Sequence, residues 1–239
     1  LIEEHNIRYN EGLEDFNMKI NNFADLTSNE FNNMKGYNPL LKKKNILKDI
    51  NSCTHRNITN IPSSIDWRDK GVVTEIKNQG QCGSCWSFSA TGAVEGVWKL
   101  NNNKLISLSE EELVECDRGV DKGCKGGVME NAYEWIIKNG GITTEKNYPY
   151  TSGNGHSEQC YKNKIHDIKA HISNYCELIH NDEKDLEKAL VQQPVAVAIE
   201  ADQNSFQFYS DGILPAYKCG SKLDHGVLAV GYGIDTEKK

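Results

Sequence analysis

Two short segments that lie far apart in this chain of 239 residues carry complementary chemistry. Residues 79–86 read Gln-Gly-Gln-Cys-Gly-Ser-Cys-Trp, and residues 224–226 read Asp-His-Gly. Cys85 and His225 are therefore 140 residues apart (225 − 85). A thiol is activated as a nucleophile when a histidine lies beside it, so a fold that uses both groups must bring an early segment against a late one. The sequence thus predicts a site where two distant parts of the chain meet.

The hydrophobic pattern from residue 61 onward changes from helical to extended. Residues 85–139 are predicted to be largely helical, and the last of these helices, over 127–139, has one apolar face and a C-cap glycine in Gly140. Later apolar segments predict strands at 165–175, 194–201 and 227–230, with one short helix over 183–192 capped by Asp182. Helices followed by strands indicate an α+β fold of two lobes, with the site in the cleft between them.

Charge and cysteine content narrow the class of protein. The formal net charge is −7 and the pI about 5.5, which argues against a nucleic-acid partner and against an anionic membrane surface. No apolar run approaches the ~18 residues of a membrane span. The first residues show no signal peptide, and since the chain does not start with Met we expect its true N-terminus upstream. Eight cysteines would indicate metal or redox chemistry in a cytosolic protein and a disulfide frame in a secreted or lysosomal one.

The signature around Cys85, followed by a histidine within roughly 130–150 residues, resembles the papain and cathepsin L family of cysteine peptidases. The resemblance extends over the whole chain. It implies a papain-like two-lobe fold, with a helical first lobe and a β-barrel-like second lobe. It also implies an endopeptidase in which Cys85 is the nucleophile, His225 the base, and the Gln79 amide a donor to the oxyanion. No occluding insertion is visible, which favours the endopeptidase mode, and neither a cofactor nor a metal is predicted.

The same resemblance implies how substrate is bound and which cysteines pair. Gly126 and Gly127 would form a backbone wall for an extended peptide. An apolar pocket for the second residue before the cut, which predicts a preference for Leu, Val or Phe, would be lined by Val128, Met129, Ala198 and Leu223. Asp224 would tune the charge beside the base. The implied disulfides are Cys82–Cys124 and Cys116–Cys160, with the partner of Cys219 beyond Lys239 and the pairing of Cys53 and Cys176 open.

Residues 1–60 resemble part of the family's inhibitory propeptide followed by a linker. Its Asn-x-Phe-x-Asp core is present as Asn21, Phe23 and Asp25, and Thr27 to Glu30 forms a capping box at the start of a short helix. The sequence over 42–60 has linker composition, so we expect the mature enzyme to start near Ile61. Residues 61–239 would be the peptidase domain, without the family's downstream Asn-Ser-Trp-Gly motif. We interpret that as a truncated C-terminus.

Two other readings of these residues remain open from the sequence. One is a catalytically inert inhibitor or binding protein that uses the propeptide-like segment. The other is chemistry at the Cys82-x-x-Cys85 pair, either as a disulfide oxidoreductase or as a zinc site with Cys116 and Cys124. For the peptidase, the expected partners are protein and peptide substrates, the propeptide itself and cystatin-like inhibitors. We expect a monomer in the lysosome, the vacuole or the extracellular space.

Overall fold

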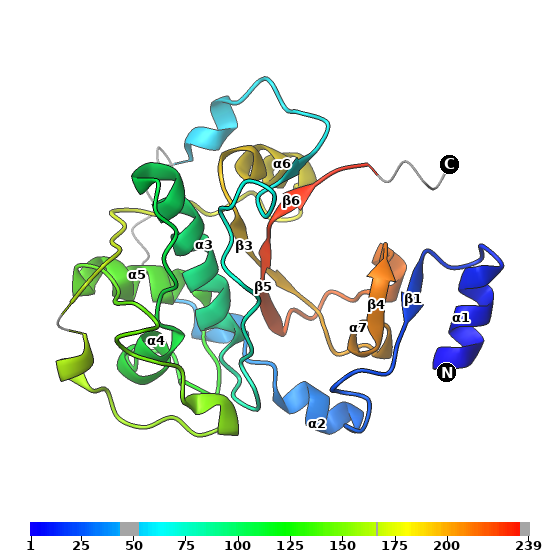
Figure 1. Cartoon of the computed structure of the whole chain (residues 1–239), viewed down its shortest axis with the longest axis horizontal. Helices are drawn as coiled ribbons and strands as arrows, with labels where there is room; N and C mark the ends of the chain where they lie inside the picture. The colour runs from blue at the N-terminus through cyan, green and yellow to red at the C-terminus, as the bar shows by residue number, and fades with distance from the viewer. Residues whose placement is uncertain (44–52, 166, 235–239) are drawn as a thin grey trace.

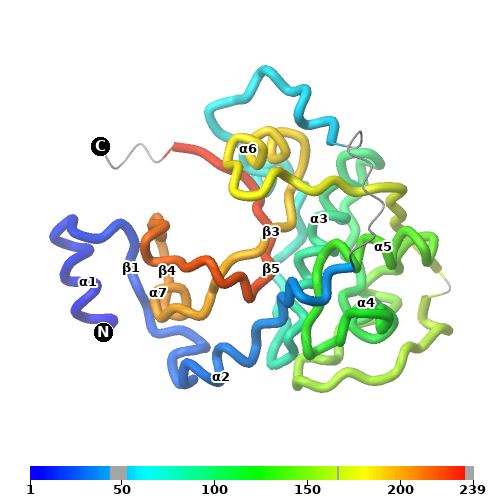
Figure 2. Tube along the Cα trace, turned by 180° about the vertical axis from the view of Figure 1, so that it is seen from behind, coloured from blue at the N-terminus to red at the C-terminus, as the bar shows by residue number. Residues whose placement is uncertain are grey.

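Three helices between residues 85 and 139 lie together on one side of the molecule, and the strands lie on the other side with the remaining helices (Figure 1, Figure 2). The N-terminal arm, residues 1–43, passes from the strand side to the helical side. The computed structural model describes residues 1–43, 53–165 and 167–234. The predicted α+β arrangement of two lobes is therefore confirmed. None of the helices in these described ranges is long and apolar enough to cross a membrane.

The first lobe contains three helices packed around one apolar core. These are α3 (Cys85–Asn102), α4 (Glu110–Cys116) and α5 (Met129–Asn139). The core cluster comprises Trp86, Ala90, Val94, Leu108, Leu113, Met129, Ala132, Ile136, Ile142 and Ala170. The predicted helix over 127–139 starts two residues later than expected, and Gly140 ends it in the left-handed conformation at φ 78°. The local signals for this helix were therefore sufficient, because both its apolar face and its C-cap glycine are encoded in the sequence.

Two glycines within α3 allow the lobes to approach closely. A Cβ atom at Gly92 would lie 2.9 Å from Leu228 on strand β5 (His225–Ala229), and one at Gly96 would lie 2.8 Å from Pro194. Glycine in a helix interior is unfavourable by about 1 kcal/mol relative to alanine. Here it removes the side chain that would hold α3 away from the second lobe, and so keeps the first residue of α3 near the start of β5.

The second lobe is built from short two-stranded ladders. Strand β3 (Val195–Ile199) pairs antiparallel with β5, so that Ile199 lies opposite His225. Strand β2 (Ile65–Asp66) pairs with β6 (Gly231–Tyr232). Helix α6 (Glu183–Gln192) has the predicted bounds and its Asp182 cap. The other elements that follow the arm in the chain are α7 (Asn204–Gln207), β4 (Tyr209–Gly212) and four 3-10 helices, η3 (Thr54–Asn57), η4 (Ser152–Asn154), η5 (Lys162–Lys164) and η6 (Ala216–Lys218). Among the described residues these ladders do not close into a barrel.

The strand predicted over 165–175 is wrong for the residues that the structure describes there. Residue 166 lies outside the described ranges, and the others form a single bridge between Ala170 and Ile142 of the first lobe. The Ile142 N–H donates to the Ala170 carbonyl at 2.7 Å. The apolar residues of this segment are thus used to cover the helical core, and no neighbouring strand is present to extend a ladder.

The N-terminal arm is anchored on the second lobe by a strand pair. The arm begins with helix α1 (Ile2–Asn10). Strand β1 (Phe16–Met18) pairs antiparallel with β4. Helix α2 (Ser28–Asn33) starts at the predicted capping box, and the 3-10 helix η1 (Pro39–Leu41) follows near the first lobe. The arm therefore extends over both lobes, whereas the linker expected over 42–60 lies partly outside the described residues.

Candidate active site

The thiol of Cys85 is buried at the N-terminus of α3. Its side chain is 1% exposed, and its Sγ atom accepts hydrogen bonds from the backbone N–H groups of Gly226 and Gly36, each at 3.3 Å. Burial raises the pKa of this thiol, while the two N–H donors act in the opposite sense. A helix N-terminus also favours a thiolate. Because Gly36 belongs to the arm, the nucleophile is covered by the chain's own N-terminal segment.

His225 is the first residue of β5, directly before the Gly226 whose N–H donates to the Cys85 thiol. Its neighbour Gly226 contacts Cys85, and a Cβ atom at Gly226 would lie 3.1 Å from Met129 Sδ and 3.3 Å from the Cys85 carbonyl oxygen. Burial lowers the pKa of His225 to about 4, and the positive charge of Lys35 adds to this shift. The Nδ1 atom has no hydrogen-bond partner among the described residues. In the covered state the imidazole and the thiol are thus both held toward their neutral forms.

Gln79 presents its side-chain amide to a peptide carbonyl of the arm. The Nε2 atom donates to the Met34 carbonyl at 2.7 Å and to the Cys82 carbonyl at 2.8 Å. The loop that carries Gln79 is held by Tyr150, whose hydroxyl donates to the Gln79 carbonyl at 2.7 Å and lies 2.8 Å from Ser84 Oγ. Tyr150 was not identified from the sequence, because a single tyrosine in a loop gives no local signal of this contact.

Gly126 and Gly127 form a backbone surface that the arm follows. The Gly127 N–H donates to the Gly36 carbonyl at 2.9 Å, and the Asn38 N–H donates to the Gly127 carbonyl at 3.1 Å. Tyr37 between them forms a parallel bridge with Gly127. Side chains would block this contact: a Cβ at Gly126 would lie 2.8 Å from the Gly36 carbonyl oxygen, and one at Gly127 would lie 2.6 Å from the Trp86 ring. The two positions thus require glycine, and they bind an extended chain through its backbone.

The four residues expected to line the apolar pocket fall into two groups. Val128 and Met129 are buried at the start of α5, whereas Ala198 and Leu223 are half-buried on the second lobe. The arm residue Tyr37 packs against the buried cluster that contains Met129, and Ala198 packs against that cluster too.

Asp224 contributes backbone and side-chain hydrogen bonds. Its carbonyl accepts from the Tyr37 N–H at 2.9 Å, and its Oδ1 atom accepts from the Ala201 N–H at 2.9 Å. Burial raises the pKa of Asp224, against the effects of the Ala201 hydrogen bond and of Lys35. The carboxylate therefore fixes the loop before β5 and adds negative charge near Lys35.

After its contact with Gly127, the arm is held by two ion pairs of Lys42, one to each lobe. Lys42 Nζ lies 2.8 Å from Glu130 Oε1 on α5 and 3.0 Å from Glu177 Oε2 on the second lobe. The Asn131 side-chain amide donates to the Leu41 carbonyl at 3.0 Å. From the sequence, Lys42 was expected only to belong to a linker. Its ion pairs could not be predicted, because the two glutamates come from segments 47 residues apart (177 − 130).

The cysteines form three disulfides. Cys82–Cys124 and Cys116–Cys160 are the pairs that the family resemblance implied, and Cys53–Cys176 resolves the pairing that the sequence left open. Cys85 and Cys219 are free thiols, buried and exposed respectively. Because Cys82 is bonded to Cys124, it does not form a redox pair with Cys85, and three of the four thiols of the zinc alternative are already in disulfides.

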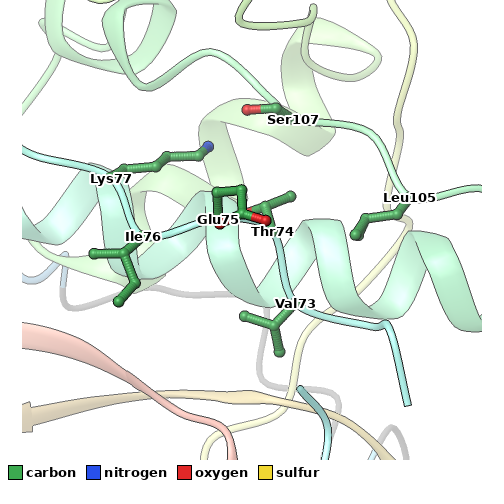
Figure 3. A pocket seen from close by; sticks show the side chains of 7 residues that line it. All are labelled: Val73, Thr74, Glu75, Ile76, Lys77, Leu105 and Ser107. Atoms are coloured by element: carbon green, nitrogen blue, oxygen red, sulfur yellow. The ribbon is translucent and has the colours of Figure 1, made fainter. Parts of the chain in front are cut away.

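A separate hollow lies along α3 in the first lobe (Figure 3). It is lined by Val73, Thr74, Glu75, Ile76, Lys77, Leu105 and Ser107. None of these residues contacts Cys85 or His225 through a described hydrogen bond or ion pair. The space over Cys85 is filled by the arm, as the low exposure of the thiol shows.

The arm thus lies over a buried thiol at a helix N-terminus, next to the strand of the opposing lobe that carries a histidine. Comparison with known families places these residues: 61–239 match the papain family cysteine protease model, and 1–31 match the cathepsin propeptide inhibitor domain. The chain belongs to the papain family of cysteine proteases.

Named relatives and solved structures agree with this assignment. The KDEL-tailed cysteine endopeptidase CEP2 of Arabidopsis thaliana is 47% identical over 98% of this chain and 66% of its own length. Vignain of Vigna mungo is 45% identical over 93% and 61%. The proform of the ragweed pollen allergen Amb a 11 superposes with a TM-score of 0.86 at 38% identity, covering 99% of this chain and 67% of that one. The chain thus spans two thirds or less of the curated relatives it matches.

Proposed function

We propose that the protein is a cysteine-type endopeptidase that is made as a zymogen and hydrolyses peptide bonds through Cys85. The observation that carries the proposal is the course of the arm. Its Gly36 N–H lies on the Cys85 thiol, and its backbone bonds to Gly127 on both sides of Tyr37. A surface that binds this peptide over the nucleophile can bind another peptide in its place once the arm has left.

The residues at the site supply each element of an acyl-transfer reaction. His225 takes the proton of the Cys85 thiol as Sγ attacks the scissile carbonyl carbon, and the C–N bond breaks as His225 passes that proton to the leaving amine, which gives a thioester and a free amine. A water molecule that gives a proton to His225 then attacks the thioester, the C–S bond breaks, and the Cys85 sulfur takes the proton back from His225 as the acid leaves. The oxyanion formed in each step requires a preorganised donor. The Gln79 amide, which donates to the Met34 carbonyl in the proenzyme, is available for that role.

The apolar pocket is proposed to select the second residue before the cut. Tyr37 of the arm and Ala198 pack against the same apolar cluster, which contains Met129, and this supports a pocket that accepts Leu, Val or Phe. Replacing Ala198 with a large residue should lower kcat/KM for Phe substrates more than for Val substrates. Equal losses for all substrates would show that Ala198 does not line this pocket.

The arm is proposed to act as an inhibitor of the chain's own active site. Its contacts occupy the Cys85 thiol, the Gln79 amide and the Gly127 backbone that a substrate would use. Three disulfides favour an oxidising compartment, so we propose the vacuole, the lysosome or the extracellular space. We propose that the protein acts on protein substrates as a monomer and that cystatin-like inhibitors bind to it.

The decisive experiment labels the full-length protein, after acid removal of the arm, with an epoxide peptide that carries Leu at the pocket position. Mass spectrometry would locate the adduct. We expect one adduct on Cys85, which is lost in His225→Ala and kept in His156→Ala, a matched change at an exposed histidine. An unlabelled Cys85 in folded, arm-free protein would overturn the peptidase proposal and favour an inert inhibitor.

A further inference from the structure

Residues 53–57 are built into the second lobe, although neither family match covers them. Cys53 is 8% exposed and forms a disulfide with Cys176, 123 residues later in the chain. The residues that follow form the 3-10 helix η3, which packs on α6. The family matches end at residue 31 and resume at residue 61, so this covalent link lies in a part of the chain that the family pattern does not describe.

A buried side-chain contact joins the same segment to α6. His55 Nε2 lies 2.9 Å from Asp185 Oδ1, and both side chains are 5% exposed. The other carboxylate oxygen of Asp185 accepts from the Ile179 N–H at 2.7 Å, and Arg56 Nε lies 3.7 Å from Oδ1. Removing a hydrogen-bond partner from a buried acceptor is destabilising. The second lobe therefore uses two neighbouring residues of this segment, His55 and Arg56, to satisfy a carboxylate in its own interior.

Further polar contacts surround this pair. Arg56 Nη2 donates to the Glu177 carbonyl at 3.3 Å, and Lys188 Nζ donates to the Arg56 carbonyl at 3.4 Å. Thr54 Oγ1 lies 3.4 Å from Gln192 Oε1 at the end of α6. These bonds connect η3 to the segment before α6, to the middle of α6 and to its last residue. None of them involves the arm residues 1–43.

We propose that residues 53–60 are a permanent part of the peptidase, retained on the second lobe by the Cys53–Cys176 disulfide and the His55–Asp185 pair after the arm is removed. The cut that frees the arm must then lie N-terminal to Cys53. A cut on the other side of Cys53 leaves the arm tied to the lobe by the disulfide, where its high effective concentration keeps the site covered. The processing boundary expected near Ile61 is replaced by one before residue 53.

The first test is the mass of the processed protein under non-reducing conditions. Full-length protein carrying Cys85→Ala would be cut by an added papain-family peptidase at mildly acid pH, so that the result does not depend on the activity of this chain. We expect the stable product to contain residues 53–60, and its non-reduced digest to contain the Cys53–Cys176 peptide. A stable product whose polypeptide begins after Cys53 once the disulfides have been reduced, with Cys53 on a separate peptide that was held only by the disulfide, would overturn the proposal.

The second test asks whether the processed protein depends on His55. We expect His55→Ala to lower the midpoint of thermal unfolding of the processed protein by several degrees, and His156→Ala, at an exposed histidine, to leave it unchanged. Equal midpoints for the two variants would show that the segment has been removed or does not stabilise the processed protein, and would overturn the proposal. If His55→Ala fails to fold, the mass measurement on the parent protein still decides the proposal.

Discussion

Gly36 should be the residue of the arm at which a single methyl group most strongly exposes the active site. A Cβ atom at this position would lie 1.8 Å from the Gly83 carbonyl oxygen and 2.4 Å from its carbon. Both atoms belong to the backbone just before Cys85, so neither can rotate away. The arm must therefore lift when Gly36 is replaced with alanine.

The free-energy cost of the substitution follows from the hydrogen bonds that break when the arm lifts. Three hydrogen bonds hold this stretch: Gly36 N–H to Cys85 Sγ, Gly127 N–H to the Gly36 carbonyl, and Asn38 N–H to the Gly127 carbonyl. At a net contribution of about 1 kcal/mol each, their loss shifts the equilibrium between the closed and the open arm toward the open arm by roughly 3 kcal/mol. Since 1.4 kcal/mol corresponds to a factor of ten, the open fraction should rise roughly 100-fold.

The assay is the rate at which a small thiol reagent modifies Cys85 in the uncut full-length protein at neutral pH. Cys85 is 1% exposed, so modification reports the open fraction. Gly119→Ala is the matched control, because a Cβ atom there meets nothing within 4 Å. If Gly36→Ala and Gly119→Ala were modified at rates within a factor of about three, the arm would not be seated against Gly83 and the reasoning would be refuted.

Three further predictions use the charges of the same structure. Lys42→Ala removes the ion pairs to two partly buried carboxylates and should speed Cys85 modification about fivefold, from a loss of about 1 kcal/mol, more at low than at high salt. The matched change at an exposed lysine, Lys104→Ala, should leave the rate unchanged. The His225 imidazole should titrate near pH 4 in the proenzyme and higher once the arm is removed, as followed by NMR. A histidine with a depressed pKa binds fewer protons in the folded state, so the proenzyme should lose stability as pH falls from about 6.5 toward about 4; an unchanged slope in His225→Gln would contradict this. Lys77→Ala leaves the buried Glu95 and Glu110 unpaired and should lower the free energy of unfolding by about 3–5 kcal/mol in urea, whereas a loss as small as that of Lys104→Ala would contradict the pairing.

Local patterns were sufficient wherever the structure depends on neighbouring residues. The capping box at Thr27 and Glu30, the glycine end of α5 and the bounds of α6 all follow from a few adjacent side chains. The motif around Cys85 and the distant His225 indicated the family, and with it the two lobes. Local patterns failed over 165–175, because an apolar segment reads as a strand whether it pairs with another strand or covers a helical core.

The sequence by itself determined the family, the α+β class and the residues that carry the proposed chemistry, because these depend on the identity and order of side chains. Tertiary structure alone decided that Cys53 bonds to Cys176, that His55 contacts Asp185, and that Lys42 joins Glu130 to Glu177. Each of these contacts joins residues from 88 to 135 positions apart (130 − 42 and 177 − 42). No local propensity specifies such a pair, since it forms only when the packing of both lobes brings the two segments within bonding distance.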